Sequence, residues 1–453
     1  MNRYRLRANY DIENIDSRKE NGTMIVDVPM LSNGKLNYGL KHIKQKLYEE
    51  EVYPSEIGFD IMSFATMVYM ADTRIERAVH GQDSWTREIE LEIPVSNIEL
   101  WDAQIPTIER MLKFLTGDFW KIILSSRTWK FNNPQEVKEK SNKFDKVSLF
   151  SGGMDSLIST INLMEDGKNT MLISHAGEGL TKNAQENIVN RFDSMYPDIL
   201  HTWLDLWMVF PNNYIPEGGN DNNTRSRSFL FIGFGIFAMT GMDNVSELMV
   251  PENGLIALNV PLDETRVGSF STRTTHPFYL SLWNKLLLGL GLNMSVVNPY
   301  WNKTKGEMAE ECKNKNVLYE TMQLSFSCSS PGKARWKGLS PQHCGYCVPC
   351  IIRRAAMHKA FENDGTVYTE ISISEMQSKN SEGMGIQLRS FQYAIDKIKK
   401  HKKYAWLYIH KPGPLPQDNE YLDELADTYL RGLLEVDTFI QDVLAQEDEN
   451  NDL

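Results

Sequence analysis

The sequence predicts an α/β protein built around a doubly wound parallel sheet, and three observations point to that fold class. Between residues 141 and 360, short apolar stretches alternate with helical stretches, which is the pattern of parallel strands joined by crossover helices. A glycine-rich segment directly follows one of these apolar stretches and precedes a helical one. Four cysteines near the end of the same region are spaced as metal ligands. We expect an N-terminal α/β or α+β domain over residues 1–140 and a mainly helical C-terminal extension over residues 361–453.

Length and composition narrow the class of protein. The 453 residues leave room for two or three domains, and 41% hydrophobic with 24% charged residues is typical of a globular protein with a sizeable core. A net charge of −12 disfavours broad nucleic-acid binding, which needs a basic face, but it is compatible with a local basic groove. The N-terminus lacks a secretory signal, and no apolar stretch is long enough to span a bilayer. Because the five cysteines suit a reduced compartment, we expect a cytoplasmic protein without membrane association.

The first region carries strand and helix patterns but no catalytic motif. Residues 24–28 form an apolar run that predicts a strand. Strict alternation over residues 89–95 predicts a half-buried strand, with Ile89, Leu91, Ile93 and Val95 on its apolar face. Residues 39–78 are expected to be mainly helical. A further helix follows, and its apolar stripe comprises Ile108, Met111, Leu112 and Leu115. Residues 132–134 mark the expected linker to the second region.

The second and third regions show further periodic patterns. Strands are expected at residues 147–150 and 170–173, and helices at residues 155–164 and 184–195. A basic run near Lys400 is interpreted as a solvated helix face. The last helix is expected to bury one face, made of Leu422, Leu425, Tyr429, Leu433, Val436 and Ile440. From Glu447 onward the acidic end is expected to be frayed.

The strongest chemical signal is the glycine-rich segment after the strand at residues 147–150. Its six residues are Ser151, Gly152, Gly153, Met154, Asp155 and Ser156. The glycines let the backbone approach an anion closely, and the following helix N-terminus directs N–H groups and partial positive charge at it. Asp155 is expected to orient the loop or to help bind Mg²⁺. The segment therefore predicts a phosphate-binding loop rather than a merely structural turn, and it lacks the Gly-Lys-Ser/Thr continuation of a Walker A motif.

A cluster of cysteines predicts a structural metal site. Its members are Cys328, Cys344, Cys347 and Cys350. Four thiolates at this spacing suit tetrahedral Zn²⁺ and leave no open position for catalysis. Part of an iron–sulfur cluster is the alternative occupant. Cys312 stands apart in a helical stretch, where we expect a half-buried thiol rather than a persulfide carrier.

These motifs resemble a known family. The loop at residues 151–156 resembles the signature of PP-loop ATP pyrophosphatases, which cleave ATP to AMP and pyrophosphate. Together with the cysteine cluster and the pair Arg353 and Arg354, it is similar to the 7-cyano-7-deazaguanine synthases. The resemblance extends over residues 145–358, with weaker matches at residues 225–228 and 302–308. It implies the HUP-like adenine nucleotide hydrolase fold and the ATP-dependent conversion of a 7-carboxy-7-deazaguanine carboxylate to an amide and then a nitrile.

The resemblance also implies a set of site residues. Arg227 and Lys305, with Asp155, are expected to be catalytic residues beside the ATP phosphates, where they stabilise developing charge. Ser174 joins the loop, Arg227 and Lys305 among the ATP-binding residues. The family's usual segment for holding the base is not recognisable in this sequence. Polar residues in its place are the candidates for substrate binding, namely Glu252, Asn253, Arg273 and His276.

The predicted function is ATP-dependent activation of a carboxylate, followed by its transfer to ammonia or to an amine of a partner protein. The resemblance implies that this carboxylate belongs to a deazapurine. The expected cofactors are ATP, Mg²⁺ and structural Zn²⁺. The enlarged layout resembles synthase-like proteins of bacterial antiphage defence operons, of the Qat type or of one branch of cyclic-nucleotide (CBASS) defence, which implies protein partners from the same operon. Two alternatives stay open, a tRNA-modifying PP-loop enzyme and a non-catalytic nucleotide-sensing module.

Overall fold

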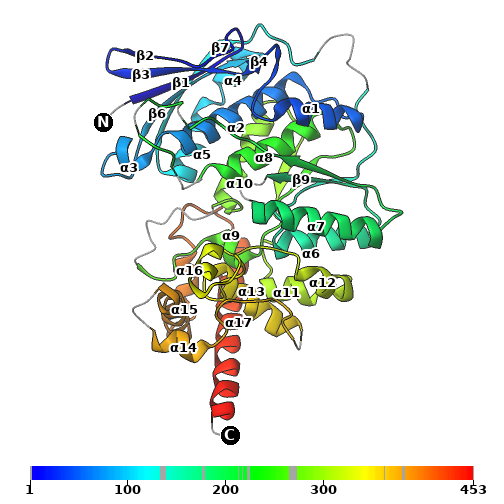
Figure 1. Cartoon of the computed structure of the whole chain (residues 1–453), viewed down its shortest axis with the longest axis vertical. Coiled ribbons are helices and arrows are strands. Elements are labelled where there is room, and N and C mark those ends of the chain that lie inside the picture. Colours follow the sequence, from blue (N-terminus) through cyan, green and yellow to red (C-terminus); the bar gives the residue numbers. More distant parts are fainter. Residues whose placement is uncertain are drawn as a thin grey trace.

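The computed structural model of the protein shows layers stacked along its longest axis (Figure 1). An N-terminal sheet, a layer of helices, a second sheet, a further layer of helices and the C-terminal helices follow one another. The structure describes residues 3–132, 139–175, 179–212, 214–216, 218–221, 225–264, 273–361, 363–379 and 383–451. Asn133 and Pro134 of the expected linker lie outside these ranges, and the division of the chain near residues 140 and 360 stays a prediction.

The N-terminal sheet has five strands in the order β2-β3-β1-β6-β7. They are β1 (Arg3–Asn9), β2 (Asp16–Glu20), β3 (Thr23–Pro29), β6 (Glu88–Val95) and β7 (Phe119–Ser126), and a small hairpin joins β4 (Leu31–Ser32) to β5 (Lys35–Leu36). Neighbours pair in parallel, except that β2 is antiparallel to β3. Alternation in β6 is confirmed, because its four predicted apolar residues are buried and those between them are half-buried.

Five helices of the N-terminal region accompany this sheet. They are α1 (Leu40–Glu49), α2 (Glu56–Arg74), α3 (Arg77–His80), α4 (Ile98–Asp102) and α5 (Ile105–Thr116). The predicted stripe of α5 is confirmed, because Ile108, Met111, Leu112 and Leu115 are all buried. The first three lie within residues 39–78 apart from the end of α3, so that region is indeed mainly helical.

The second sheet has five strands in the order β10-β9-β8-β11-β12, and every neighbouring pair is parallel. They are β8 (Lys146–Leu149), β9 (Thr170–His175), β10 (His201–Leu206), β11 (Glu247–Met249) and β12 (Ser295–Val297). The order reverses between β8 and β11, and ligands of open parallel sheets bind outside the carboxyl ends of the strands at such a reversal. The structure confirms an α/β protein with parallel strands, whereas the doubly wound arrangement stays a prediction.

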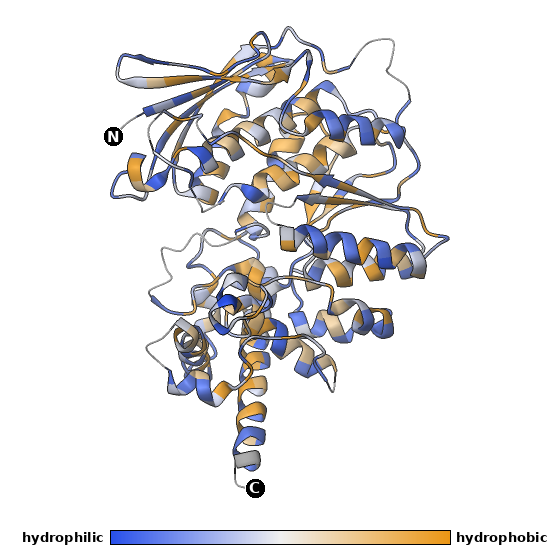
Figure 2. Cartoon of the chain, in the orientation of Figure 1, coloured by the Kyte–Doolittle hydropathy of each residue, from blue (hydrophilic) through white to orange (hydrophobic). Residues whose placement is uncertain are grey.

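Helices of this second region connect the strands and carry the core. They are α6 (Met154–Glu165), α7 (Gly179–Met195), α8 (Arg227–Met239), α9 (Gly254–Leu258), α10 (Pro277–Gly289), α11 (Lys305–Glu310), α12 (Lys315–Met322) and α13 (Val348–Ala360), with a 3-10 helix η2 (Pro331–Lys337). One side of α8 packs on α2 and another on β8, β9 and β11. Gly233 of α8 permits this close approach, because a Cβ there would lie 2.8 Å from the Cβ of Ala65. The two apolar helices form the centre of a core shared by both sheets (Figure 2).

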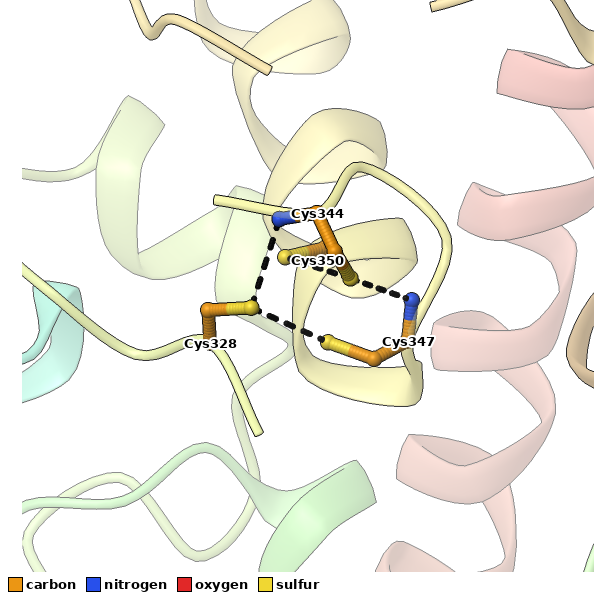
Figure 3. Close-up of side chains that lie close together, drawn as sticks. All are labelled: Cys328, Cys344, Cys347 and Cys350. Carbon is orange, nitrogen blue, oxygen red and sulfur yellow. Dashed lines mark hydrogen bonds between the residues drawn. The ribbon is translucent and has the colours of Figure 1, made fainter. Parts of the chain in front are cut away.

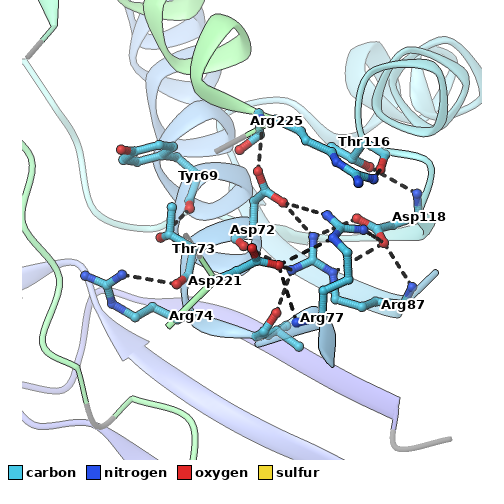
Figure 4. A network of polar contacts seen from close by, with 12 residues as sticks. Tyr69, Asp72, Thr73, Arg74, Arg77, Arg87, Thr116, Asp118, Asp221 and Arg225 are labelled. Atoms are coloured by element: carbon cyan, nitrogen blue, oxygen red, sulfur yellow. Dashed lines mark hydrogen bonds and ion pairs between the residues drawn. The ribbon is translucent and has the colours of Figure 1, made fainter. Parts of the chain in front are cut away.

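A buried ionic network links the N-terminal region to the start of α8 (Figure 4). The Asp72 carboxylate accepts hydrogen bonds from Arg87 at 2.5 Å and Arg77 at 3.1 Å. Both arginines also donate to Asp118, at 2.7 Å and 2.5 Å respectively. The other Asp72 oxygen accepts the backbone N–H of Ser226 at 2.8 Å. The network therefore fixes the residue that precedes Arg227, one of the candidate catalytic residues.

The C-terminal helices pack around one long helix. They are α14 (Ile373–Ser378), α15 (Gly383–Lys400), α16 (Tyr404–Tyr408) and α17 (Asn419–Asn451), and α17 contacts α9, α13, α14, α15 and α16. The predicted apolar face of α17 is confirmed, since all six of its residues are buried. The expected fraying is wrong for residues 447–451, because the Glu447 carboxylate accepts the N–H groups of Ile373 and Ser374 at 2.9 Å and α17 continues to Asn451. Within the described ranges, no helix has the length and apolar character needed to cross a membrane.

Replacing Asp72 with asparagine tests the ionic network. We expect Asp72→Asn to lower the free energy of unfolding by about 3–5 kcal/mol, because two buried guanidinium groups lose a counter-charge. Urea denaturation followed by circular dichroism measures this change.

Glu88→Gln serves as the control, because Glu88 makes a solvent-exposed ion pair with Arg3 at 2.6 Å. We expect this variant to unfold at nearly the wild-type urea concentration. If Asp72→Asn also did so, the network would not be a stabilising link.

Candidate active site

The glycine-rich loop lies at the carboxyl end of β8, next to the strand-order reversal. Gly152 has a φ of 79°, in the left-handed region, and a Cβ there would lie 2.9 Å from the Cγ of Gln185. The Gln185 side chain donates to the Ser151 carbonyl at 3.2 Å, and the Gly152 carbonyl accepts the N–H of Phe326 at 2.8 Å. These contacts fix the loop on both sides. The close approach of Gln185 requires glycine at position 152.

The N-terminus of α6 opens directly onto this loop. Gly153 is its N-cap residue and has no side chain to cap the helix, so the backbone N–H groups of the first turn can bind an anion. The Ser151 and Ser156 hydroxyls lie 3.2 Å apart in the same turn. The arrangement fits a phosphate-binding loop with hydroxyl donors beside it.

The Asp155 carboxylate joins three segments that lie far apart in the sequence. One oxygen accepts the backbone N–H of Asn253 at 3.1 Å and its side-chain amide at 2.8 Å. Its other oxygen lies 2.8 Å from the Nζ of Lys305. All three side chains are largely buried. Since both oxygens have protein partners, these contacts favour a role for Asp155 in orienting the loop, one of its two expected roles.

Lys305 is the first residue of α11, and two sets of contacts fix its position. Thr304 and Glu307 form a reciprocal capping box at the start of the helix. From α17, the Glu435 carboxylate accepts the Thr304 hydroxyl at 2.5 Å and the N–H of Gly306 at 2.9 Å. The C-terminal helix α17 thus braces the segment that carries Lys305.

Glu252 places a second carboxyl group in the site. Its backbone is fixed by Asn298, which accepts its N–H at 3.2 Å and donates to its carbonyl at 2.7 Å. Its side chain accepts the Thr275 hydroxyl. Burial raises the pKa of Glu252 to about 7; the Asp155 charge also raises it, while the Thr275 hydrogen bond and the Lys305 charge oppose the shift. Glu252 can therefore exchange a proton near neutral pH.

A cavity of about 540 Å³ brings these residues together. Its lining includes Ser151, Gly153, Met154, Asp155, Glu252 and Lys305. It then extends past Ser327, Ser329 and Ser330 to the start of α13 and to α15. The size lies within the range of small-molecule sites, and Asn259, Lys333 and Gln387 add polar groups to the lining beyond the loop.

Ser174 and Arg227 form a separate group at the end of β9 and do not line this cavity. The Ser174 hydroxyl donates to the Phe150 carbonyl at 2.6 Å, just before the loop. Arg227 donates to the His175 carbonyl at 2.7 Å and to its Nδ1 at 3.3 Å. Burial lowers the pKa of His175 to about 3, and the Arg227 charge lowers it too, so the ring is neutral.

Asn253 lies at the site through its hydrogen bond to Asp155, although none of Asn253, Arg273 and His276 lines the cavity. Arg273 donates to the Phe114 carbonyl at 2.6 Å, and its guanidinium lies 4.5 Å from the centre of the Phe114 ring. The Nδ1 of His276 accepts the N–H of Phe278 at 3.2 Å and so caps α10. These contacts give both residues structural roles, and substrate binding by either stays a prediction.

The four predicted cysteines form one cluster, with all four sulfur atoms within 4.8 Å of one another (Figure 3). The Sγ atoms of Cys328 and Cys347 lie 3.9 Å apart, and those of Cys344 and Cys350 lie 4.0 Å apart. Four sulfurs at 2.3 Å from one tetrahedral zinc ion would be separated by roughly 3.8 Å. Gly345 makes the turn, with a φ of 88° and a Cβ position only 2.0 Å from the Glu370 carbonyl oxygen.

Backbone N–H groups donate hydrogen bonds to two of these sulfur atoms. Cys344 donates to the sulfur of Cys328, and Cys347 to that of Cys344, both at 3.3 Å. Such donors stabilise thiolates, so the donor set fits a zinc ion. The cluster lies beside the loop, because a Cβ on Gly153 would lie 3.7 Å from the Cβ of Ser327, the neighbour of Cys328. A bound metal would therefore fix the serine segment against the phosphate loop.

The expectation of a half-buried cysteine in a helix is wrong, because Cys312 is buried in the connection between α11 and α12. Its thiol lies 3.7 Å from the Asn314 carbonyl oxygen. Burial raises its pKa above the ordinary thiol value. A buried thiol with a raised pKa is a poor nucleophile, which agrees with the structural role expected for it.

Several residues of the site escaped the sequence analysis. Gln185 and Thr275 carry no motif, since their role depends on contacts across the fold. The serines beside Cys328 offered a visible signal, because hydroxyl groups gather next to a predicted metal ligand. Gln387 and Phe391 of α15 line the cavity from a region expected only to be helical.

Comparisons with known proteins show one distant similarity. The chain is 25% identical over 245 residues to the 7-cyano-7-deazaguanine synthase of Methanothermobacter thermautotrophicus, a match that spans 49% of this chain and 99% of that protein. No family model matches the chain. The similarity supports an enzyme related to that synthase and leaves about half of this chain without a counterpart in it.

Glu252 makes a prediction about pH. Because its pKa is raised from an ordinary value of 4.5 to about 7, the folded protein retains a proton in this window that the unfolded chain has released. The Glu252 contribution to stability therefore falls as pH rises from 4.5 to 7. We expect wild type to lose stability relative to Glu252→Gln over this window, as measured by urea denaturation at several pH values. A difference between the two that does not change with pH would contradict the shift.

The cysteine cluster makes a prediction about metal content. We expect purified protein to contain about one zinc ion per chain by elemental analysis, without the visible absorption of an iron–sulfur cluster. Cys347→Ser is expected to lose the metal. Cys312→Ser, which alters the cysteine outside the cluster, is expected to retain it. Iron in place of zinc, or metal retained by Cys347→Ser, would refute the assignment.

Proposed function

We propose that this protein activates a carboxylate by splitting ATP between its α and β phosphates, and that the acid is 7-carboxy-7-deazaguanine or a related deazapurine. A nitrogen nucleophile then displaces AMP. The observation that carries the proposal is the meeting of Ser151, Gly153, Asp155 and Lys305 at one end of the cavity, beside the N-terminus of α6. The distant similarity to 7-cyano-7-deazaguanine synthase supports the choice of substrate.

In this proposal, the loop at residues 151–156 binds the phosphates of ATP through backbone N–H groups and the Ser151 and Ser156 hydroxyls. Lys305 supplies positive charge where charge accumulates on the phosphates. Ser174 and Arg227 bind the nucleotide from the end of β9. Mg²⁺ would neutralise charge on the departing pyrophosphate, and Glu252, a carboxylate of the cavity lining, would accept a hydrogen bond from a water molecule bound to that ion.

The acid is expected to bind with its carboxylate toward the α phosphate, because catalysis then depends on positioning and charge stabilisation. The carboxylate oxygen forms the bond to phosphorus, and the bond from phosphorus to the pyrophosphate oxygen breaks. When the nitrogen nucleophile attacks the acyl-adenylate, a proton leaves the nitrogen. Glu252, with its pKa near 7, is the group that accepts it.

The proposal also covers the nucleophile that receives the activated acid and the cellular process in which the protein acts. We propose that the acceptor is ammonia or an amine of a partner protein and that the protein acts with partners from the same operon in bacterial antiphage defence, in the cytoplasm. The length of the chain supports this, because about half of it has no counterpart in the synthase it resembles. Extra elements around an enzyme core offer surface for such partners.

Mass spectrometry of the reaction products tests the proposal. Purified protein with ATP, Mg²⁺ and 7-carboxy-7-deazaguanine is expected to form AMP and pyrophosphate, with an amide or nitrile base when ammonium is added. A partner protein that is the acceptor would instead gain the mass of an acylated deazaguanine. ATP binding without AMP would favour a nucleotide sensor, and AMP formed only with tRNA would favour a tRNA-modifying enzyme; either result would refute the proposal.

Lys305 gives the sharpest test by mutation. We expect Lys305→Ala to lower kcat/KM for AMP formation on the order of 10²-fold or more, because its charge is preorganised at the phosphate loop. Lys303→Ala is the control, since Lys303 lies two residues away and pairs with Glu311 on the surface at 2.7 Å. Equal activity of the two variants, with circular dichroism showing both folded, would exclude Lys305 from catalysis.

A further inference from the structure

Both residues that pair with Asp155 lie in segments that the last helix of the chain contacts. Asn253 caps α9, and Lys305 is the first residue of α11. Helix α17 packs on α9, where the methyl group of Thr428 would lie 2.5 Å from a Cβ at position 254. Glu435, two turns further along α17, reaches the segment of Lys305. One helix therefore holds both partners of the Asp155 carboxylate.

The Glu435 carboxylate contacts both sequence neighbours of Lys305. One of its oxygens accepts the Thr304 hydroxyl at 2.5 Å, and the other accepts the backbone N–H of Gly306 at 2.9 Å. The Thr304 hydroxyl also accepts the N–H of Glu307 at 3.1 Å as the cap of α11, so its single proton is left for the carboxylate. The start of α11, and with it the backbone of Lys305, is thus fixed from α17.

Only a carboxylate satisfies both donors at this position. Each Glu435 oxygen accepts a hydrogen bond, whereas an amide of the same shape has one oxygen and one NH₂ group and would place a donor against a donor. The Glu435 side chain is 6% exposed, so water has little access to replace a lost contact. The Lys359 ammonium group, 3.5 Å away, balances its charge.

Close packing leaves the Glu435 side chain little freedom to move. A Cβ on Gly306 would lie 2.5 Å from one of the carboxylate oxygens, so this approach requires glycine. One turn earlier on α17, Arg431 donates to the Asn302 carbonyl at 3.1 Å and pairs with Glu307. These contacts hold the two ends of the segment against α17.

We propose that Glu435 is a positioning residue of the reaction, which acts through Thr304 and Gly306 to hold the Lys305 ammonium group at the phosphate loop. This inference rests on the proposed function for the role of Lys305 at the ATP phosphates. It gives the C-terminal extension, which lies outside the residues that carry the family resemblance, a part in ATP binding. Without Glu435 the start of α11 is free to shift, and a displacement of about 1 Å lowers rates on the order of 10²-fold.

A double-mutant cycle measured by isothermal titration calorimetry tests whether Glu435 acts through Lys305. The ligand is α,β-methylene-ATP with Mg²⁺, so the measurement does not depend on turnover. We expect Glu435→Gln and Lys305→Ala each to weaken binding about tenfold, because both remove the same charge-assisted contact with the phosphates. In the Lys305→Ala background, Glu435→Gln is expected to change binding less than about twofold.

Glu447 of the same helix provides a matched control. Its carboxylate accepts the N–H groups of Ile373 and Ser374 at the start of α14, a helix that does not line the cavity. Glu447→Gln therefore loses the same kind of contact away from the site, and we expect it to bind the ATP analogue as wild type does. Glu435→Asp retains two acceptor oxygens on a shorter side chain and is expected to give an intermediate loss. Urea denaturation shows whether each variant is folded.

Three results would overturn the inference. They are unchanged binding by Glu435→Gln, an equal loss in Glu447→Gln, and a Glu435→Gln effect of the same size with and without Lys305. The last would show that α17 supports the fold rather than the ammonium group.

AMP formation by wild type, measured in parallel, separates this inference from the proposed function. Coupling between Glu435 and Lys305 without AMP formation would refute the function and leave Glu435 as a positioning residue for a bound nucleotide. AMP formation with independent effects of the two residues would refute only the inference. If wild type does not bind the analogue, both proposals fail.

Discussion

The buried contact of Asp155 with Lys305 and Asn253 is the constraint on which the rest of the site depends. Removing charged groups from water is unfavourable, and a buried ion pair returns little net stability unless its hydrogen bonds are complete. One Asp155 oxygen accepts two N–H donors of Asn253, and the other has the Lys305 ammonium group as its ion-pair partner at 2.8 Å. The gain is one of position. A single carboxylate fixes the relative positions of the phosphate loop, the segment after β11 and the start of α11, at the point where the strand order reverses.

Structures outside the parallel sheet maintain this arrangement. From one side, α17 braces the segment of Lys305 through Glu435, so the last helix of the chain supports a residue at the phosphate loop. From another, the cysteine cluster includes Cys328, whose neighbour Ser327 lies beside Gly153. The Asp72 network, in the N-terminal region, fixes the residue before Arg227. The additional regions therefore have a physical role in the site.

Local signals in the sequence were sufficient for much of this architecture. The loop at residues 151–156, the four cysteines and the apolar face of α17 are each readable from residue type and spacing, and the loop and cysteines lie where these signals placed them. Long-range contacts were not readable. Glu447 looked like part of a frayed end because its partners, the N–H groups at the start of α14, lie more than 70 positions away. Gln387 carried no local signal, since only the folded chain shows that it lines the cavity. The alternation of Tyr4, Leu6 and Ala8 in β1 was masked by the arginines between them.

The most direct test of the central claim is the fate of isotopically labelled carboxylate oxygen. An acyl-adenylate forms only if a carboxylate oxygen attacks the α phosphate, and that oxygen leaves with AMP when nitrogen displaces it. With ¹⁸O in both carboxylate oxygens of 7-carboxy-7-deazaguanine, the account predicts AMP that carries one ¹⁸O atom, detected by mass spectrometry. Product formed with unlabelled AMP, or label recovered in inorganic phosphate beside ADP, would contradict activation of the carboxylate by adenylation.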